Sequence, residues 1–489
     1  MIKLLRTSLY RSGLFFGLII LLGACTSSNK KKQKKDIQDA VEEVVDLDLD
    51  QILERGYITA IVDNSSTGLF LYKGRPMGYE YELLSIFADS IGIELKLEIT
   101  PSLEKAFQKL NSGEGDILAH NLTVTKERQE RIGFTNYHNI VRQVLVQRKP
   151  DNWRKMKLHE IEQTMLRTPI ELIGKEIHVR SSSAYTSRLR NLSDEIGGDI
   201  IIIEEAEDIE TEKIIQKVAE REIDYTVVDE NIALVNARYY PNLDIKTPVS
   251  LPQQIAWGVR KNSDSLLTVL NDWIFEMKKT PEYYTIYNKY FKNTRRSKSR
   301  VESDFFSAGE EYISPYDSLI KLVAQDVGWD WMLLAAQISK ESKFDPKAES
   351  WAGAVGLMQI LPKNGEEYGV KDLTDPTQNL TAGKKHLQWL EGIWQSAILD
   401  SLERKKFILA SYNVGQGHVQ DAVRLAKKFG LDTAVWENNV EKALLLKSSA
   451  KYYKDDVVKF GYCRCTEPID YVEDIMKLYS EYKQIVDVN

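Results

Sequence analysis

The pattern of apolar residues changes once along the chain, near residue 300, and this change limits the fold more than any other feature. Before it, short apolar runs such as GYITAIV and ELKLEIT alternate with amphipathic segments such as YELLSIFADSIG. After it, one amphipathic helical segment follows another. Alternation predicts an α/β fold with a largely parallel sheet, whereas helical segments alone predict an all-α domain. A chain of 489 residues also exceeds one typical hydrophobic core, so two modules are expected.

The first module contains a pattern that occurs twice. KLNSGEGDILAHN ends a helix, turns and enters a strand through an Asp, and QKVAEREIDYTVVDE does the same more than a hundred residues later. This repetition predicts two similar α/β lobes, and LPQQIAWGVRK would return the chain to the first. NTRRSKSRVESDFFSAGEE follows neither period and is typical of a linker. We therefore predict a bilobed module at 47–295, a linker at 296–312 and an α-rich domain at 313–489.

The N-terminus has the layout of a secretory signal. Lys3, Arg6 and Arg11 precede the apolar run LFFGLIILLGA, which is too short to span a bilayer comfortably. Small residues then stand directly before Cys25 in LLGAC, which resembles the lipobox of bacterial lipoproteins. The alternative is a plain signal peptide with an incidental cysteine.

The lipobox resemblance implies that residues 1–24 are removed and that Cys25 carries lipid. The anchor would hold the chain to a membrane on its periplasmic side. Thr26 after the cysteine favours the outer membrane, by analogy with enterobacterial sorting only. Residues 25–46 include TSSNKKKQKKD, which cannot bury apolar area, so this segment is predicted to be a flexible tether.

Charge and cysteine content exclude some functions. The net charge is −7, and basic residues do not cluster beyond the N-terminus, so a nucleic-acid partner is not expected. Cys463 and Cys465 in GYCRC lack further ligands at a metal-binding spacing. We predict no metal site and no cofactor, and we interpret these two cysteines as buried free thiols.

The first module also carries a family resemblance. GYEYELLSIFADSIGIELKLEIT, followed by DILAHNLTVTKERQERIGFT, resembles the periplasmic amino-acid-binding proteins, which have the bilobed α/β periplasmic-binding-protein fold. The resemblance implies that Thr123 and Arg128, with Asn121 beside them, hold a ligand carboxylate. Ser183 would add a hydroxyl and a backbone N–H, and Asp229 would take the ligand ammonium. A zwitterion needs such a bidentate cation and a fixed anion, both shielded from water.

The residues of this module leave alternatives open. Arg128 stands among KERQER, where a solvated helix charge is equally consistent with spacing alone, and Asp229 has an ordinary structural interpretation too. Asn121 replaces the small residue usual in the family. The ligand is therefore an amino acid, a wall-derived muropeptide, or nothing at all if the lobe pair is now a scaffold.

Glu341 is the candidate catalytic residue of the second module. Asp330 is predicted to cap a helix that ends near Ser342 and whose upstream face is apolar. A carboxyl at the end of such a helix lies at the edge of an apolar cleft, where desolvation raises its pKa and keeps a proton available to a general acid. The alternative is a solvated carboxylate on a helix end.

Downstream motifs give this glutamate its context. Taken alone, the loop AGAVGLMQILP and the segment ASYNVGQG have ordinary structural interpretations, as turns, core residues and helix ends. In the order ES, GLMQI, SYNVG, GYCRCTEPIDYVEDI they resemble the soluble-lytic-transglycosylase domain, an α-rich, goose-lysozyme-like fold that cleaves peptidoglycan. The resemblance implies that Glu341 is the single catalytic acid/base, and that Glu467 and Tyr471 are structural supports. Five residues would line the sugar subsites: Ser350, Met358, Gln359, Tyr412 and Asn413.

The fusion of the two modules resembles the membrane-bound lytic murein transglycosylases of the F type. The resemblance implies cleavage of the bond between N-acetylmuramic acid and N-acetylglucosamine, with 1,6-anhydromuramoyl ends as product. Tyr412 would contact the muramoyl N-acetyl group or Glu341. The nearby acids are Asp345, Glu349, Glu366 and Glu367, and none of them is an evident candidate for a catalytic nucleophile.

Two rival functions remain open. One is a muramidase of the same fold, in which water attacks instead of the sugar's own hydroxyl. The other is a non-catalytic lipoprotein that captures an amino acid or peptide and only docks on the wall. A further hypothesis is that ligand closure of the bilobed module changes the access of glycan to the catalytic domain.

Overall fold

The computed structural model describes residues 44–65, 67–206, 209–293, 300, 303–307 and 312–486. The predictions for the signal peptide, for Cys25 and for most of the tether lie outside these residues, as does most of the predicted linker. In the described part of the chain, no helix combines the length and the apolar character needed to cross a membrane.

The first lobe is a five-stranded sheet whose centre is parallel. Strand β1 pairs in parallel with β4 and β5, and β14 returns antiparallel from far along the chain, as predicted for LPQQIAWGVRK. The sheet order is β4 (Glu94–Ile99), β1 (Tyr57–Val62), β5 (Ile117–Ala119), β14 (Gly258–Val259) and β6 (Gly133–Phe134). The helices of this lobe are α2 (Leu49–Arg55), α3 (Tyr79–Ser90), α4 (Leu103–Ser112), α5 (Lys126–Arg131), α10 (Asp264–Met277) and α11 (Pro281–Tyr287).

The second lobe repeats this architecture around a core of its own. Its sheet order is β10 (Ile201–Glu204), β9 (Glu176–Val179), β11 (Tyr225–Asp229), β8 (Gln143–Arg148) and β12 (Leu243–Pro248). Its helices are α6 (Leu158–Thr164), α7 (Ala184–Ile196), α8 (Thr211–Glu220) and α9 (Glu230–Tyr239). The chain passes between the lobes through β7 (Asn139–Val141) and β13 (Gln253–Ile255), which pair antiparallel. The predicted bilobed α/β fold is confirmed.

The C-terminal part is helical, as predicted. Its helices are α13 (Asp317–Val327), α14 (Trp331–Ser342), α15 (Pro362–Glu367), α16 (Pro376–Trp394), α17 (Ser401–Val414), α18 (Gln416–Lys428), α19 (Glu441–Leu446), α20 (Ala450–Tyr453) and α21 (Thr466–Val486). Asp330 caps α14 by accepting a hydrogen bond of 2.9 Å from the backbone N–H of Met332. Helix α21 packs against α14 and α17 and is a central element of this domain.

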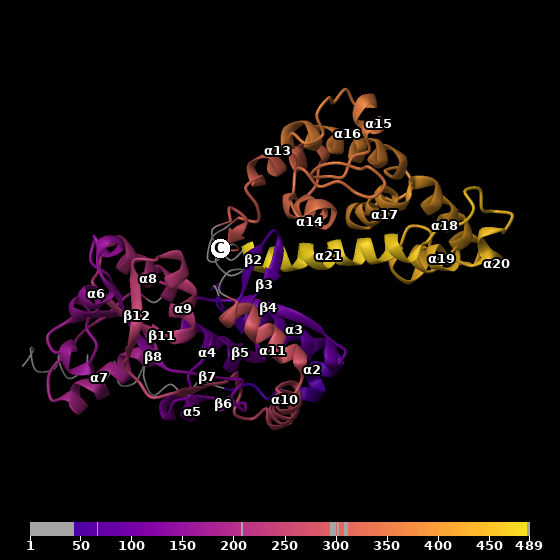
Figure 1. Cartoon of the computed structure of the whole chain (residues 1–489). Coiled ribbons are helices and arrows are strands. Elements are labelled where there is room, and N and C mark those ends of the chain that lie inside the picture. The colour runs from indigo at the N-terminus through magenta and orange to yellow at the C-terminus, as the bar shows by residue number, and fades with distance from the viewer. Residues whose placement is uncertain are drawn as a thin grey trace, which may run out of the picture.

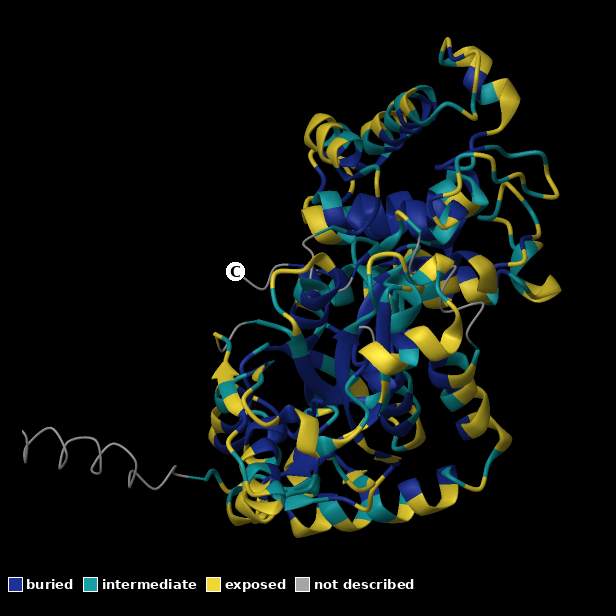
Figure 2. Ribbon diagram, turned by 60° about the vertical axis from the view of Figure 1, so that its left-hand side comes forward, coloured by how far each residue is buried: buried dark blue, intermediate teal, exposed yellow. Residues whose placement is uncertain are grey.

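Helix α21 also joins the C-terminal domain to the first lobe (Figure 1). Its Gln484 accepts a 2.7 Å bond from the backbone N–H of Leu97 in β4, and its Glu481 accepts a 3.0 Å bond from Tyr81. Buried side chains of the first lobe and of the C-terminal domain belong to one continuous hydrophobic core. Figure 2 shows buried residues concentrated in the strands and exposed residues on the outer helix surfaces.

A β-hairpin of the first lobe also contacts the C-terminal domain. Strands β2 (Phe70–Tyr72) and β3 (Arg75–Met77) meet at Gly74, whose carbonyl accepts bonds from Ser339 at 3.2 Å and from Tyr482. Gly74 has a φ of 67°, and a Cβ added there would stand 2.2 Å from the ring of Phe344. Only glycine fits this contact, whose partners Ser339 and Phe344 are two and three residues from Glu341 in sequence.

The interpretation of the two downstream cysteines as free thiols is wrong. Cys463 and Cys465 form a disulfide in the segment before α21, with their Cα atoms 5.1 Å apart. Both residues are buried, as expected. Two residues of spacing are enough to bring the sulfurs together when the intervening backbone turns, which the sequence pattern does not reveal.

Candidate functional site

Glu341 lies in the last turn of α14, on the side facing α21 and α17. Its Oε1 accepts a hydrogen bond of 2.5 Å from the hydroxyl of Tyr471, a buried residue of α21. Burial raises the pKa of Glu341 to about 7, against the opposing effects of the Tyr471 hydrogen bond and of the Lys340 charge. This carboxyl therefore holds a proton at neutral pH far more often than an exposed glutamate does.

Tyr471 was predicted to be a structural support, and the structure gives it a direct bond to the candidate acid. Gln337, one turn before Glu341 on α14, donates to the Tyr471 hydroxyl at 3.4 Å and is fully buried. The chain Gln337–Tyr471–Glu341 thus fixes the direction of the carboxyl. A tyrosine in a late helix carries no such signal in sequence, because its partner lies 130 residues away.

Tyr412 lies near Glu341 without a hydrogen bond to it. Its hydroxyl donates to the backbone carbonyl of Met358 at 2.7 Å. The pKa of Tyr412 is raised well above its usual value, mainly by burial and then by the charge of Glu341. This bond therefore connects the loop that contains Met358 to α17, beside the candidate acid. The neighbouring Asn413 is exposed.

The loop between α14 and α15 is held by its own polar groups. Gln359 donates its side-chain amide to the carbonyls of Ala348 and Gly356, at 3.1 and 2.9 Å. Ser350 accepts a 3.0 Å bond from the backbone N–H of Ala354. Met358 is fully buried, so it supports the loop from below. In this structure the predicted sugar-binding residues of the loop thus bond to or pack against the protein itself.

Asn379, which sequence reasoning missed, organises this loop from α16. Its side chain is fully buried, accepts from the backbone N–H of Met358 at 2.8 Å and donates to the carbonyls of Val355 and Leu373, each at 2.8 Å. Gly356 must approach it closely, because a Cβ there would stand 2.2 Å from the Asn379 amide nitrogen. A buried asparagine inside an amphipathic helix was the available signal.

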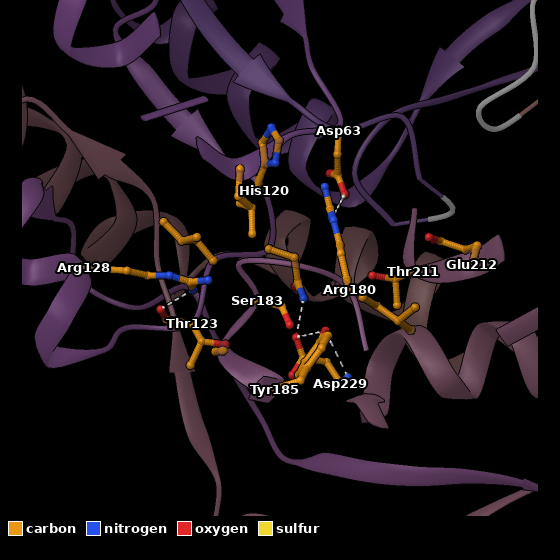
Figure 3. A pocket seen from close by; sticks show the side chains of 15 residues that line it. Asp63, His120, Thr123, Arg128, Arg180, Ser183, Tyr185, Thr211, Glu212 and Asp229 are labelled. Carbon is orange, nitrogen blue, oxygen red and sulfur yellow. Dashed lines mark hydrogen bonds and ion pairs between the residues drawn. The ribbon is translucent and has the colours of Figure 1, made fainter. Parts of the chain in front are cut away.

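The second candidate site is the cavity between the two lobes (Figure 3). All five residues predicted to contact a ligand line it, and they are Asn121, Thr123, Arg128, Ser183 and Asp229. Arg128 is 8% exposed and donates to the carbonyl of Thr123 at 3.0 Å and to that of Ser182 at 3.4 Å. Burial excludes the interpretation of Arg128 as a solvated helix charge.

Asp229 faces this cavity from the end of β11. Its carboxylate accepts bonds from Asn121 at 2.9 Å and from the hydroxyl of Tyr185 at 3.3 Å. Burial raises the pKa of Asp229 to about 7, although these bonds and the charge of Arg128 oppose the rise.

The cavity also contains charged groups that sequence reasoning missed. Asp63, at the end of β1, stands 3.9 Å from Arg180, at the end of β9, and both are buried. Burial lowers the pKa of nearby His120 to about 3, so this imidazole is neutral. The signal was available, since polar residues directly after parallel strands meet at one edge of an α/β sheet.

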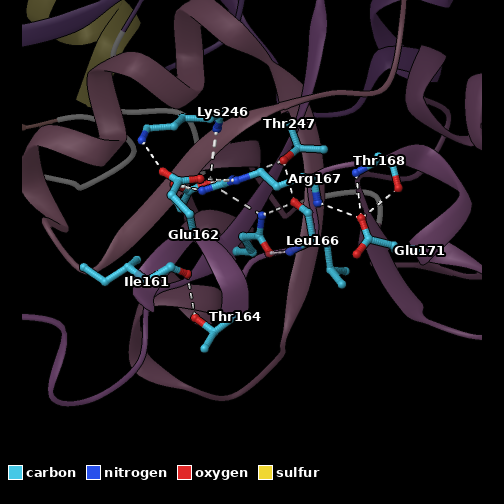
Figure 4. A network of polar contacts seen from close by, with 11 residues as sticks. Ile161, Glu162, Thr164, Leu166, Arg167, Thr168, Glu171, Lys246 and Thr247 are labelled. Atoms are coloured by element: carbon cyan, nitrogen blue, oxygen red, sulfur yellow. Dashed lines mark hydrogen bonds and ion pairs between the residues drawn. The ribbon is translucent and has the colours of Figure 1, made fainter. Parts of the chain in front are cut away.

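A separate polar network stabilises the second lobe (Figure 4). Arg167 bonds Asp244 at 2.5 and 3.0 Å and Glu162 at 2.6 Å, while Lys246 bonds Glu162 at 2.7 Å. These contacts fasten the segment after α6 to β12. The network lies apart from the cavity residues and has a structural role.

Family models match both modules. Residues 58–293 match the model of bacterial extracellular solute-binding proteins, family 3, and residues 318–434 match the transglycosylase SLT domain. An ancestral arginine-binding protein bound to arginine covers 48% of this chain, at 21% identity and a TM-score of 0.41, and the match covers 99% of that protein.

Two relatives resemble the chain over most of its length. A membrane-bound lytic murein transglycosylase F of Desulfosudis oleivorans is 36% identical over 89% of this chain and 91% of its own. One of Pseudomonas fluorescens is 28% identical over 95% of this chain and 88% of its own. With both modules present in the same order, the chain belongs to the family of membrane-bound lytic murein transglycosylases F.

Proposed function

We propose that the chain is a peptidoglycan lytic transglycosylase in which Glu341 is the single acid/base. The observation that carries the proposal is the carboxyl of Glu341 itself, with a pKa near 7 and a 2.5 Å hydrogen bond from Tyr471. An acid that is half protonated near neutral pH donates a proton and afterwards accepts one, and both steps are needed here.

In the proposed mechanism, Glu341 gives its proton to the glycosidic oxygen as the C1–O4 bond of the muramoyl residue breaks. The muramoyl N-acetyl oxygen stabilises the cationic C1. The Glu341 carboxylate, stabilised by the Tyr471 hydroxyl, then removes the proton of the muramoyl C6 hydroxyl, and O6 bonds to C1. The proton count closes on Glu341, and no water is consumed. An intramolecular hydroxyl has a large effective concentration when the ring is held well.

A second carboxylate is not needed for this route. The four acids considered from sequence, Asp345, Glu349, Glu366 and Glu367, are all exposed. A retaining hydrolase places its nucleophile about 5 Å from the acid, in the same cleft. The muramidase alternative would use Glu341 in the same way and differ only in the attacking group. Identification of the new glycan ends by mass spectrometry separates the two reactions.

We further propose that the interlobe cavity binds a small ligand from the wall and that binding is coupled to cleavage. The support for a ligand site is the set of buried charges that converge there from both lobes. The support for coupling is the hairpin contact, since Gly74 of the first lobe touches Ser339 and Phe344 on either side of Glu341. Coupling requires the ligand to prefer one arrangement of the active site. A cleavage rate unchanged by saturating wall fragments would contradict it.

We also propose that Cys25 carries the lipid anchor, and that the chain faces the periplasm from the outer membrane. The support is the order of charge, apolar run, small residues and cysteine, together with relatives named membrane-bound. The division into a tether at 25–46, a bilobed module at 47–295, a linker at 296–312 and a catalytic domain at 313–489 belongs to the same proposal.

A further inference from the structure

An exposed tryptophan on α16 lies close to the candidate active site. Trp389 has 45% of its surface exposed, whereas Trp394, on the same helix, is 3% exposed and belongs to the core. A single exposed apolar side chain on a protein surface needs no explanation. Trp389 differs from such a residue because it is the outer end of a row of aromatic rings.

The row connects Trp389 to Tyr412. The ring of Trp389 stacks on His386, with centroids 5.4 Å apart and planes 27° apart, and His386 meets Tyr412 edge to face at 5.0 Å. These separations are typical of favourable aromatic pairs. Tyr412 bonds the carbonyl of Met358 at 2.7 Å, and the charge of Glu341 contributes to its raised pKa. Two ring contacts therefore connect Trp389 to the surroundings of the candidate acid.

The middle ring of the row, His386, is held in place from two sides. Its Nδ1 lies 2.9 Å from the hydroxyl of Tyr368, and burial lowers the pKa of His386, so the ring is uncharged at neutral pH. Three residues before it on α16, Gly383 lies directly against the sulfur of Met358. Since His386 covers one face of the indole, the exposed surface of Trp389 lies on the opposite face and at the ring edges.

This exposed indole face suits a sugar ring. In a β-1,4-linked pyranose the hydroxyl groups point outward around the ring, so axial C–H groups form two apolar faces. Stacking one such face on an indole removes apolar surface of both partners from water and places C–H groups over the negative face of the π-system. A glycan strand cut at Glu341 continues beyond Tyr412 as a polymer of such rings.

We propose that Trp389 is a substrate-binding residue that holds a further sugar ring of the glycan strand, beyond the rings that flank the cleaved bond. The inference rests on the proposed function and deepens it, because it adds a subsite to the same site. His386 is its positioning residue, since it fixes the orientation of the indole. Affinity should therefore depend on whether a glycan is long enough to reach Trp389.

The test is Trp389→Ala, with binding measured by isothermal titration calorimetry on the purified chain. The probes are β-1,4-linked oligomers of N-acetylglucosamine with two to six rings, which offer the same pyranose faces. Trp389→Tyr retains an aromatic face. Phe429→Ala is the matched control, because Phe429 directly follows α18, is 41% exposed and contacts the ring of Tyr452 instead of the row.

The expected result depends on the length of the oligomer. The affinity of the wild type rises with length, and Trp389→Ala weakens binding of the longest oligomer by about fivefold or more, because an anchoring tryptophan is lost. Binding of the shortest oligomer is unchanged in Trp389→Ala. Trp389→Tyr retains most of the affinity for the longest oligomer, and Phe429→Ala behaves as the wild type.

Three results would overturn the inference. One is a wild type that binds none of the oligomers, or binds all of them equally. Another is a Trp389→Ala variant that binds the longest oligomer as tightly as the wild type does. The third is equal weakening at every length, which would mean that the substitution only damages the domain. Binding of these oligomers requires no cleavage, so failure here is separate from failure of Glu341 to cut peptidoglycan.

Discussion

The hydroxyl of Tyr471 lies 2.5 Å from Oε1 of Glu341, and it joins the last helix of the chain to the carboxyl on which the proposed chemistry depends. This hydrogen bond stabilises the carboxylate and so lowers the pKa of Glu341, while burial raises it to about 7. The pKa of Glu341 therefore results from burial, which raises it, and from Tyr471 and Lys340, which lower it.

Tyr471→Phe removes the bond that favours the charged form. The pKa of Glu341 should rise, so the alkaline limb of the pH–rate profile should move to higher pH. The rate at the optimum should fall about tenfold or more, because a hydrogen bond to a charged group contributes roughly 1.5–3 kcal/mol. The measurement is the pH dependence of glycan cleavage.

Tyr479→Phe is the matched control for that variant. Tyr479 is on the same helix and donates to Asp330, the cap of α14, at 2.8 Å. The loss of this hydroxyl should leave the pH–rate profile of cleavage unshifted. An unshifted profile in Tyr471→Phe would mean that the tyrosine only supports the fold.

Glu341→Gln should change how stability depends on pH. The folded pKa of Glu341, about 7, lies above its ordinary value of 4.5, so the stability contributed by its proton is complete below pH 4.5 and is lost as pH rises through 7. Glutamine does not titrate. Relative to the wild type, the free energy of unfolding of the variant should therefore rise by roughly 2–3 kcal/mol between pH 4.5 and pH 8. Thermal unfolding at the two pH values checks this, and an equal difference at both would contradict it.

Gly356→Ala should disrupt the loop beside the candidate acid. The new methyl group would meet the Asn379 amide and the Leu373 carbonyl, each at 2.2 Å, at a φ of 83°. Activity should fall at least tenfold as the Met358 segment shifts. Gly353→Ala is the matched control: at a φ of 80° with open space around it, the substitution introduces backbone strain without a steric clash. Equal losses in both variants would show that the close approach to Asn379 is unimportant.

Gly74→Ala should weaken the contact between the modules. A methyl group at the hairpin tip would stand 2.2 Å from the Phe344 ring, so we expect a loss of roughly 1–3 kcal/mol. Gly92→Ala has a similar φ, 72°, and nothing within 4 Å, so it should cost about 1 kcal/mol. Denaturant unfolding compares them, and limited proteolysis should cut Gly74→Ala faster. Similar stabilities would argue against a tight hairpin contact.

Cys25→Ala tests the proposed anchor. Without the lipidated cysteine the chain lacks its attachment, so it should move from the membrane fraction to the soluble fraction of the cells. The wild type should also incorporate labelled fatty acid, and the variant should not. A variant that still sediments with membranes would contradict the proposed anchor at Cys25.

The sequence predicted the modules because each depends on a regular period. Alternating runs such as GYITAIV and ELKLEIT became the parallel neighbours β1 and β4, and the helix that carries Glu341 ends at Ser342, as predicted. The resemblance to amino-acid-binding proteins also assigned Asn121, Thr123 and Arg128 to one site, and all three line the interlobe cavity.

The unpredicted features depend on contacts between distant segments. Tyr471 reaches Glu341 across 130 residues, and Asn379 reaches Met358 across 21. The residues around Tyr471 and Asn379 do not indicate these distant partners. The Cys463–Cys465 disulfide depends on a local backbone turn that periodicity does not specify. The hairpin at Gly74 depends on an interface between modules, which no pattern within either module reveals.

The most direct test of the account is digestion of purified peptidoglycan, with the released fragments identified by mass spectrometry. Three chains are compared: the wild type, Glu341→Gln and, as a control, Glu349→Gln, which alters an exposed acid of the neighbouring loop. We predict 1,6-anhydromuramoyl ends from the wild type and from Glu349→Gln, and none from Glu341→Gln. Reducing muramic ends from the wild type would make the chain a hydrolase, and cleavage by Glu341→Gln at the wild-type rate would refute the proposed role of Glu341.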